Sequence, residues 1–256
     1  MPNSRLWDSL GEPVIIAHRG GAIEAPENTR YAFELMRYLN FRYIETDVRS
    51  TKDGIAVIVH DRRIDRVSSH RGRVCDYTWE ELSAMTDHSG GYFMRLDEVL
   101  SEFPDMIFNV DAKENRVVEP LINAIEAAQA RSRVCVASFS ERRLRRLRRA
   151  LPGIASSLSV LSVIKLFFAV RSPRAIRSIL LRFIPGYLQG VQAVQVPREF
   201  HGIEIVNQAF VEAAREQGWA VHVWTVNDTT VARRLLDLGV QGIITDIPQR
   251  MASIWP

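Results

Sequence analysis

Two acidic residues and a histidine come together in one short stretch of the sequence. Residues 43–61 read YIETDVRSTKDGIAVIVHD. Because strand side chains alternate between faces, Glu45 and Asp47 are expected to share one side. The TKDG turn leaves too few residues for a parallel crossover, so the next apolar run predicts an antiparallel hairpin that ends at His60. Two close carboxylates repel each other, and a divalent cation removes that penalty. The stretch therefore predicts a metal and proton-transfer site.

The rest of the chain alternates between apolar strands and amphipathic helices. Eight strand-like segments lie near residues 15, 45, 108, 136, 156, 194, 222 and 243. This alternation predicts a TIM-type (β/α)8 barrel with a β-hairpin extension, and about 250 residues is the usual length for one. An open doubly wound sheet is the rival, but the glycine fingerprint of a dinucleotide site is missing. We expect one domain over 1–256, with 62–105 as a small insertion over the C-terminal mouth.

Polar side chains gather where the predicted strands end, which is where barrel enzymes place their active sites. These residues are His18, Glu45, Asp47, Asp111, Lys113, Ser138 and Trp224. Taken alone, the Glu-x-Asp pair is more typical of a salt-bridged pair than of a catalytic site. Ser138 has no neighbouring His and Asp, so we do not predict a nucleophile there. His222 lies deeper in its strand and is expected to be a hydrogen-bonded interior residue.

Nine short motifs in a fixed order give the sequence a family resemblance. They are AHRGG (17–21), APENTRYAF (25–33), ETDVRSTKDG (45–54), VIVHD (57–61), NVDAK (109–113), SF (138–139), QVP (195–197), VWTVND (223–228) and GVQGIITDIP (239–248). Together they resemble the glycerophosphodiester phosphodiesterase family. The resemblance implies a barrel that hydrolyses glycerophosphodiesters to sn-glycerol 3-phosphate and an alcohol. It also implies one divalent cation, Mg²⁺ or Ca²⁺.

The same resemblance implies a role for each matching residue. By match, the expected metal ligands are Glu45, Asp47 and Asp111, the catalytic histidines are His18 and His60, the phosphate contacts are Arg19 and Lys113, and the pocket wall is Trp224. The family's usual third ligand is a glutamate, so Asp111 is one methylene shorter. Histidine suits both proton transfers because its pKa is ordinarily near 6.5. The sequence leaves open which histidine is the acid, and whether a glycerol hydroxyl or water attacks first.

Composition bounds the compartment and the partners. The two cysteines lack metal-like spacing and are expected to be reduced, as in a cytosol. We find no signal-peptide pattern and no apolar run long enough to span a membrane. We therefore expect a cytoplasmic protein, with peripheral attachment to the inner face of the membrane as an option. No nucleic-acid partner is expected, and the headgroup preference and oligomeric state stay open.

Positive charge is concentrated in one segment. Residues 131–182 hold thirteen Arg or Lys and one acid, a net charge of +12 that leaves −9 for the rest of the chain. A stretch that overlaps its end, 158–185, is more apolar than one barrel helix needs. One interpretation is a barrel helix with an extra packed loop and a solvated arginine face. The other is an interfacial segment on an anionic membrane, which favours lysophospholipase D-type cleavage of lysophospholipids. A catalytically silent barrel that binds a phosphorylated ligand is the alternative of another class.

Overall fold

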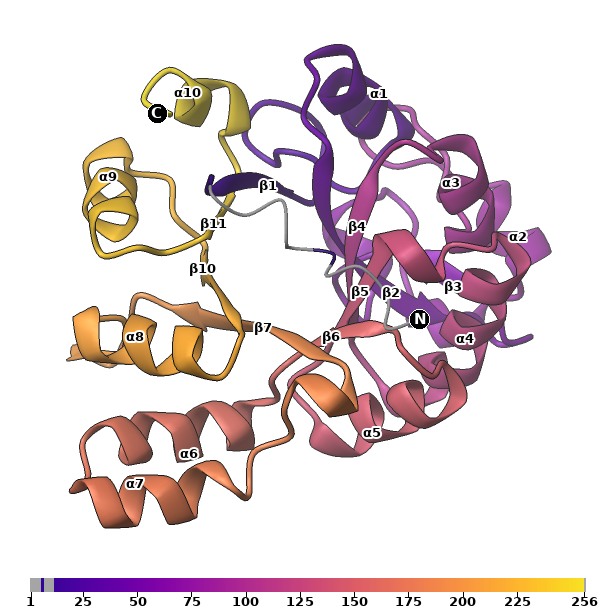
Figure 1. The fold of residues 1–256 in the computed structure, drawn as a ribbon. Helices are drawn as coiled ribbons and strands as arrows, with labels where there is room; N and C mark the ends of the chain where they lie inside the picture. The colour runs from indigo at the N-terminus through magenta and orange to yellow at the C-terminus, as the bar shows by residue number, and fades with distance from the viewer. Residues whose placement is uncertain (1–5, 7–11, 256) are drawn as a thin grey trace.

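A closed ring of parallel strands forms the centre of the molecule (Figure 1). The computed structural model describes residue 6 and residues 12–255. The barrel strands are β1 (Val14–His18), β2 (Tyr43–Ser50), β4 (Ile107–Ala112), β5 (Val134–Ala137), β6 (Ala155–Ser157), β7 (Val191–Pro197), β10 (Ala220–Trp224) and β11 (Gly242–Thr245). The ring closes because β1 pairs in parallel with both β2 and β11. The predicted barrel and its strand positions are confirmed.

Helices surround this ring and cover its outer face. They are α1 (Arg30–Tyr38), α3 (Leu96–Glu102), α4 (Val118–Ala127), α5 (Glu141–Ala150), α6 (Val160–Val170), α7 (Arg174–Leu181), α8 (Gln208–Glu216), α9 (Thr229–Asp237) and α10 (Pro248–Ala252). Helix α3 packs against α4, so it belongs to the ring although it lies within the expected 62–105 insertion. No helix in the described part of the chain is long and apolar enough to cross a membrane.

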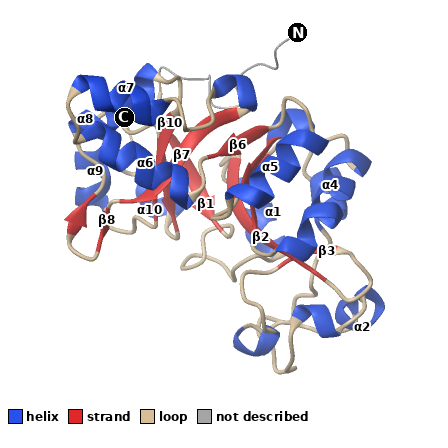
Figure 2. Ribbon diagram, turned by 90° about the horizontal axis from the view of Figure 1, so that it is seen from below, coloured by secondary structure: helices blue, strands red, loops and turns tan. Residues whose placement is uncertain are grey.

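An antiparallel arm extends β2, as the hairpin pattern predicts. Strand β3 (Ala56–Ile58) pairs with β2, and Val48 lies opposite Ile58. The following segment forms short turns and helix α2 (Trp79–Ser83). Thr78 caps α2 in a capping box with Glu81. Figure 2 shows this segment projecting from the barrel beside β3, which is consistent with an excursion at the mouth.

One sequence expectation about a helix start is wrong. The apolar pattern predicts one helix over 203–218, beginning at Ile203. In the structure Ile203–Glu204 instead forms β9, which pairs with β8 (Glu199–Phe200). Helix α8 begins only after Asn207, whose side chain accepts the hydrogen bond of the Phe210 amide. The cap residue fixes the start because it satisfies an amide that the first turn leaves unpaired.

The core between the first helices and the sheet is built around one aromatic side chain. Phe33 of α1 is fully buried and packs edge-on against Phe103 and Phe108. Thr29 starts α1 by accepting the Ala32 amide, so the cap orients the helix face that carries Phe33. This packing holds α1 against the strands that carry the polar residues.

We expect Phe33→Ala to lower the free energy of unfolding by about 3–5 kcal/mol, because it leaves a cavity among buried rings. Chemical denaturation measures the change. Tyr38→Ala on the same helix is the control: Tyr38 is 82% exposed, so its truncation should cost less than about 0.5 kcal/mol. Equal losses in the two variants would contradict this account of the core.

Candidate active site

Strand register brings the predicted acids and one histidine together at the mouth of the barrel. His18 lies beside Glu45 in the β1–β2 pair, and Asp47 lies beside Asp111 in the β2–β4 pair. The period of two along β2 gives Glu45 and Asp47 the same inward face. Val59, just after β3, donates its amide to the Asp47 carbonyl at 2.9 Å. The hairpin therefore returns His60 to the same acids.

The turn after β1 places an arginine over this cluster. Arg19, Gly20 and Gly21 all have positive φ, with Gly20 at +81°. A Cβ on Gly20 would lie 2.8 Å from Cβ of Ala32, so glycine alone fits both the backbone and the space. The turn sends the Arg19 side chain back toward β2, where Nε lies 3.3 Å from Oδ2 of Asp47.

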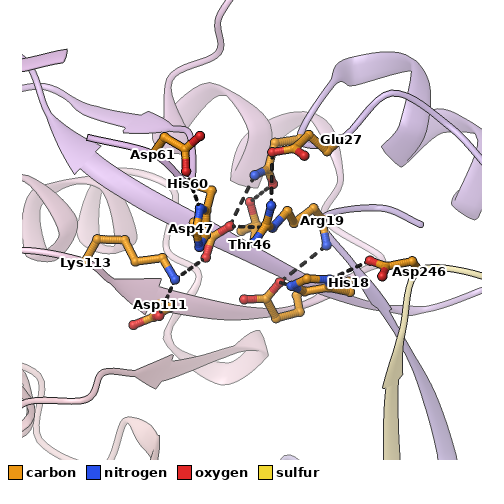
Figure 3. Close-up of polar contacts among 12 residues, drawn as sticks. His18, Arg19, Glu27, Thr46, Asp47, His60, Asp61, Asp111, Lys113 and Asp246 are labelled. Atoms are coloured by element: carbon orange, nitrogen blue, oxygen red, sulfur yellow. Dashed lines mark hydrogen bonds and ion pairs between the residues drawn. The ribbon is translucent and has the colours of Figure 1, made fainter. Parts of the chain in front are cut away.

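Lys113 bridges two of the three acids (Figure 3). Its ammonium lies 2.7 Å from Oδ1 of Asp47 and 2.7 Å from Oδ2 of Asp111. Burial alone would lower the pKa of Lys113, but the charges of Asp111 and Asp47 raise it above its usual range. Lys113 is therefore a permanent positive charge between the two carboxylates.

Burial divides the three acids into two kinds. Burial raises the pKa of Glu45 to about 8, and the charge of Asp47 adds to the rise. Burial also raises the pKa of Asp111, and the negative charge of Asp47 adds to the rise, although the positive charge of Lys113 opposes it. Burial would raise the pKa of Asp47 as well, but the positive charges of Lys113 and Arg19 outweigh the effect of burial, so the pKa of Asp47 is lowered. The site therefore holds one firmly ionised carboxylate and two that need more positive charge.

Each histidine is hydrogen-bonded to its own carboxylate. Nδ1 of His18 lies 2.6 Å from Oδ1 of Asp246, and Nδ1 of His60 lies 2.7 Å from Oδ1 of Asp61. A carboxylate at Nδ1 fixes the ring orientation and leaves Nε2 for chemistry. Nε2 of His18 lies 3.7 Å from Oε2 of Glu45. Both imidazoles line one pocket with Asp47 and Lys113.

The two histidines have pKa values displaced in opposite directions. For His18, burial lowers the pKa, but the hydrogen bond to Asp246 and the charge of Glu45 raise it further than burial lowers it. For His60, burial dominates over the charge of Asp47 and the hydrogen bond to Asp61, so its pKa falls. Near neutral pH, His18 is the better proton donor and His60 the better acceptor.

Sequence reasoning missed Arg66, which holds this site from outside, whereas the APENTRYAF motif (25–33) already suggests Glu27 as a contact outside the site. Arg66, from the segment after β3, donates to both oxygens of Glu27 at 2.7 and 2.8 Å and pairs with Asp61. Glu27 in turn accepts from Arg19 at 3.2 Å. The network joins Arg19 to the carboxylate that orients His60. The HD dipeptide of VIVHD (57–61) places Asp61 beside His60 in the sequence, whereas Arg66 has no such signal.

The sequence around the start of α1 suggests Asn28 or Thr29 as its cap and no further role for either, but Asn28 does more than that. Thr29 alone caps α1. Asn28 donates Nδ2 to Oδ2 of Asp47 at 3.3 Å and accepts from the Thr46 hydroxyl at 2.7 Å. It therefore adds a neutral donor to the ionised carboxylate.

The other expected residues lie where their strands place them. His222 is fully buried, within 3.3 Å of Gln195, and burial lowers its pKa to about 3, which confirms a hydrogen-bonded interior histidine. Ser138 donates to the Ala112 carbonyl and accepts from Arg143. Trp224 lines the pocket and stacks on Phe139, with ring centroids 6.1 Å apart.

The acid cluster was tested as a site for a divalent cation. Among the residues described, no three His, Cys, Asp or Glu side chains are arranged to hold a metal ion, and Lys113 bridges two of the expected ligands. The donor chemistry nevertheless fits a hard cation, because all three acids are buried oxygen donors. Oδ1 of Asp111 is buried without a hydrogen-bond partner, and Glu45 has a raised pKa. Both features call for added positive charge.

Comparison with known proteins gives consistent matches over most of the chain. The model of the glycerophosphoryl diester phosphodiesterase family matches residues 18–250. A Mycobacterium tuberculosis protein named probable glycerophosphodiester phosphodiesterase 2 is 36% identical over 92% of this chain and 88% of its own length. A glycerophosphodiester phosphodiesterase structure from Agrobacterium tumefaciens superposes with a TM-score of 0.76 at 21% identity, covering 94% of this chain and 99% of the other.

A further solved structure contains a bound product. It is an Oleispira antarctica phosphodiesterase in complex with sn-glycerol-3-phosphate, with a TM-score of 0.74 and 23% identity. The match covers 97% of this chain and 98% of that one. At this identity the superposition supports the shared barrel fold.

We expect Asp246→Asn to lower the pKa of His18 in the metal-free protein, because the change removes the acceptor charge that favours the imidazolium. NMR titration of the His18 ring measures the shift. Asp237→Asn is the matched control, since Asp237 is exposed at the end of α9. An unchanged or raised His18 pKa in the Asp246 variant would contradict the hydrogen bond described.

Proposed function

This chain belongs to the glycerophosphoryl diester phosphodiesterase family, and on that premise we propose that it hydrolyses glycerophosphodiesters to sn-glycerol 3-phosphate and an alcohol. The members of this family are phosphoric diester hydrolases. The product in the Oleispira antarctica complex supports sn-glycerol 3-phosphate as the product here. We treat residues 1–256 as one catalytic barrel.

One observation carries the proposal: two histidines, each with a carboxylate at Nδ1, face one pocket that also holds Arg19 and Lys113. Hydrolysis of a diester needs a base for the attacking hydroxyl and an acid for the leaving alkoxide. Groups whose surroundings separate their pKa values are suited to these two roles.

The pKa directions support one division of labour. His60 takes the proton from the attacking oxygen through Nε2, while Asp61 at Nδ1 stabilises the imidazolium that forms. His18, whose Nδ1 is hydrogen-bonded to Asp246, gives its Nε2 proton to the oxygen of the leaving alcohol. The bond between phosphorus and that oxygen breaks as the new phosphorus–oxygen bond forms. The same roles serve direct attack by water. They also serve attack by a neighbouring glycerol hydroxyl, which leaves a cyclic phosphate that water then opens with the roles of the two histidines exchanged.

Arg19 and Lys113 are proposed as the phosphate contacts. An ammonium has three N–H donors, and Lys113 uses two of them on Asp47 and Asp111. Arg19 donates Nη1 to Glu27, and its Nε lies 3.3 Å from Asp47 as an ion pair, which leaves further guanidinium donors for phosphate oxygens. Both cations are held in place before substrate arrives, so they offset the negative charge that develops on the phosphate at little reorganisation cost.

Glu45, Asp47 and Asp111 are proposed to hold the divalent cation. The family is generally dependent on a divalent metal, and the buried acids provide the oxygen donors that Mg²⁺ or Ca²⁺ prefers. A bound cation supplies Lewis-acid charge stabilisation at the phosphate. It would also reverse the raised pKa of Glu45, so that this carboxylate is ionised at neutral pH.

A second substrate class is favoured by the mouth of the pocket. Phe139, 60% exposed, stacks on Trp224 at the rim, and Leu158 lines the same pocket. Trp224 is proposed as the pocket wall. An apolar rim suits a lysophospholipid, whose acyl chain leaves the pocket on the glycerol side, as well as a small water-soluble diester.

Replacing His18 or His60 by Ala should lower kcat for glycerophosphocholine by at least about 100-fold, the usual contribution of one general acid or base. Choline release measures the rate. His88→Ala, at an exposed loop position, should keep wild-type activity. Full activity in both site variants would end the acid–base assignment, and an inactive wild type with metal would favour the silent, phosphate-binding barrel.

Chelation should abolish this activity, and added Mg²⁺ or Ca²⁺ should restore it. Glu45→Gln should then require at least about tenfold more metal for half-maximal activity, because a ligand charge is lost. Glu98→Gln, at an exposed acid on α3, is the control and should follow the wild-type curve. Activity that resists exhaustive chelation would remove the metal from the proposal.

A further inference from the structure

Helices α6 and α7 present two rows of large apolar side chains to solvent. On α6 the row is Leu161, Ile164 and Phe168, which are 64%, 45% and 57% exposed. On α7 (Arg174–Leu181) and in the turn just after it, the row is Ile176, Ile179 and Phe183, which are 49%, 56% and 66% exposed. Spacings of three and four place each row on one helix face. Exposed apolar area of this extent marks an interaction surface.

The two rows belong to one paired element at the margin of the barrel (Figure 1). Helix α6 packs against both α7 and α8, and its buried side carries Leu166 and Ala169. Nζ of Lys165 donates to the Phe183 carbonyl at 3.2 Å, so the middle of α6 lies beside the end of α7. The exposed rows are therefore additional to the face that already packs on the barrel.

This apolar surface begins at the rim of the active site. The first residue of α6, Val160, donates its amide to the Phe139 carbonyl at 3.3 Å and is 43% exposed. Phe139 stacks on Trp224, and both line the catalytic pocket. Apolar side chains thus continue from the pocket rim through Val160 to Leu161 and along α6.

The charge along this part of the sequence has one sign, although Arg177 of α7 is paired with Glu216 of α8 at 2.6 Å. Residues 142–198 contain twelve Arg or Lys and no Asp or Glu. Lys165, Arg171 and Arg182 are exposed on or beside the helix pair. The Arg171 guanidinium lies 3.6 Å from the Phe167 ring centroid, so a cationic head accompanies an aromatic side chain. Aliphatic rows flanked by arginines match the acyl region and the anionic headgroups of a bilayer leaflet.

We propose that α6 and α7 dock the barrel on an anionic lipid surface with the pocket mouth at the membrane. A nucleic acid also carries negative charge that would attract these arginines, but it has no apolar surface against which the rows of Leu, Ile and Phe could be buried. The docked enzyme takes diesters from that surface, with lysophospholipids as the substrate class; this extension to substrate rests on the proposed function. Attachment is peripheral, through side chains on two short helices.

Vesicle flotation at low salt tests the docking without any catalytic step. The probes are vesicles of phosphatidylglycerol and phosphatidylcholine in equal parts, and vesicles of pure phosphatidylcholine. Wild-type protein should float with the anionic vesicles only. The double variants Ile164→Gln/Phe168→Gln and Ile179→Gln/Phe183→Gln should each bind at least about tenfold less, because they lose buried apolar area at the interface.

Matched measurements separate docking from folding and from catalysis. Tyr38→Gln removes an even more exposed aromatic residue, on α1, and should float like the wild type. All variants should hydrolyse soluble glycerophosphocholine at the wild-type rate, whereas the double variants should lose at least about tenfold in rate on lysophosphatidylcholine carried in anionic vesicles. If neither the wild type nor any variant cleaves either substrate, the proposed function is wrong. The flotation result still tests the docking in that case, because it involves no catalytic step.

Two results would overturn the proposal. One is a wild type that does not float with anionic vesicles, or double variants that float as well as it does. The other is sedimentation of the wild type as a dimer that both double variants convert to monomers, without vesicle binding in any of them. In that case a second copy of the chain, rather than lipid, covers the two rows.

Discussion

The need to keep buried carboxylates next to positive charge governs the arrangement of this site. Glu45, Asp47 and Asp111 are all buried at the strand ends, where an uncompensated charge is costly. Lys113 and Arg19 compensate Asp47, but the pKa values of Glu45 and Asp111 stay raised. A surplus of buried acid is therefore built into the barrel mouth. A bound cation would stabilise these carboxylates in their ionised forms. The same surplus holds the hydrogen-bond donors of Arg19 and Lys113 where a phosphate can bind.

The barrel makes this surplus possible because hydrogen-bond register, not side-chain attraction, holds the acids together. Asp47 and Asp111 are register neighbours on adjacent parallel strands, so their repulsion is opposed by the whole β2–β4 ladder. The histidines arrive from outside that ladder. His18 ends β1, and His60 returns on the antiparallel arm. Asp246, after β11, and Asp61 then set their orientation from two different sides of the mouth.

Much of this architecture could be predicted from the sequence because it depends on local periodicity. Alternation fixed the eight strands, and the short TKDG turn required the hairpin that brings His60 to Asp47. The Arg66–Glu27–Arg19 network could not be predicted, because its members are held together by tertiary packing of an irregular segment. Asn28 was assigned to a cap for the same reason: its partners Asp47 and Thr46 lie on another element. The start of α8 was misjudged because apolar residues at 203–206 continue the helical pattern past its true cap.

The most direct test of the central claim is the fate of the phosphorus–oxygen bond. Glycerophosphocholine should be incubated with the enzyme and Mg²⁺ or Ca²⁺ in ¹⁸O-enriched water, and the products followed by ³¹P NMR. The account predicts that the diester resonance is replaced by that of glycerol 3-phosphate, with its phosphorus signal shifted by bonded ¹⁸O. Release of phosphocholine, a glycerol 3-phosphate without the isotope shift, or an unchanged diester would contradict it.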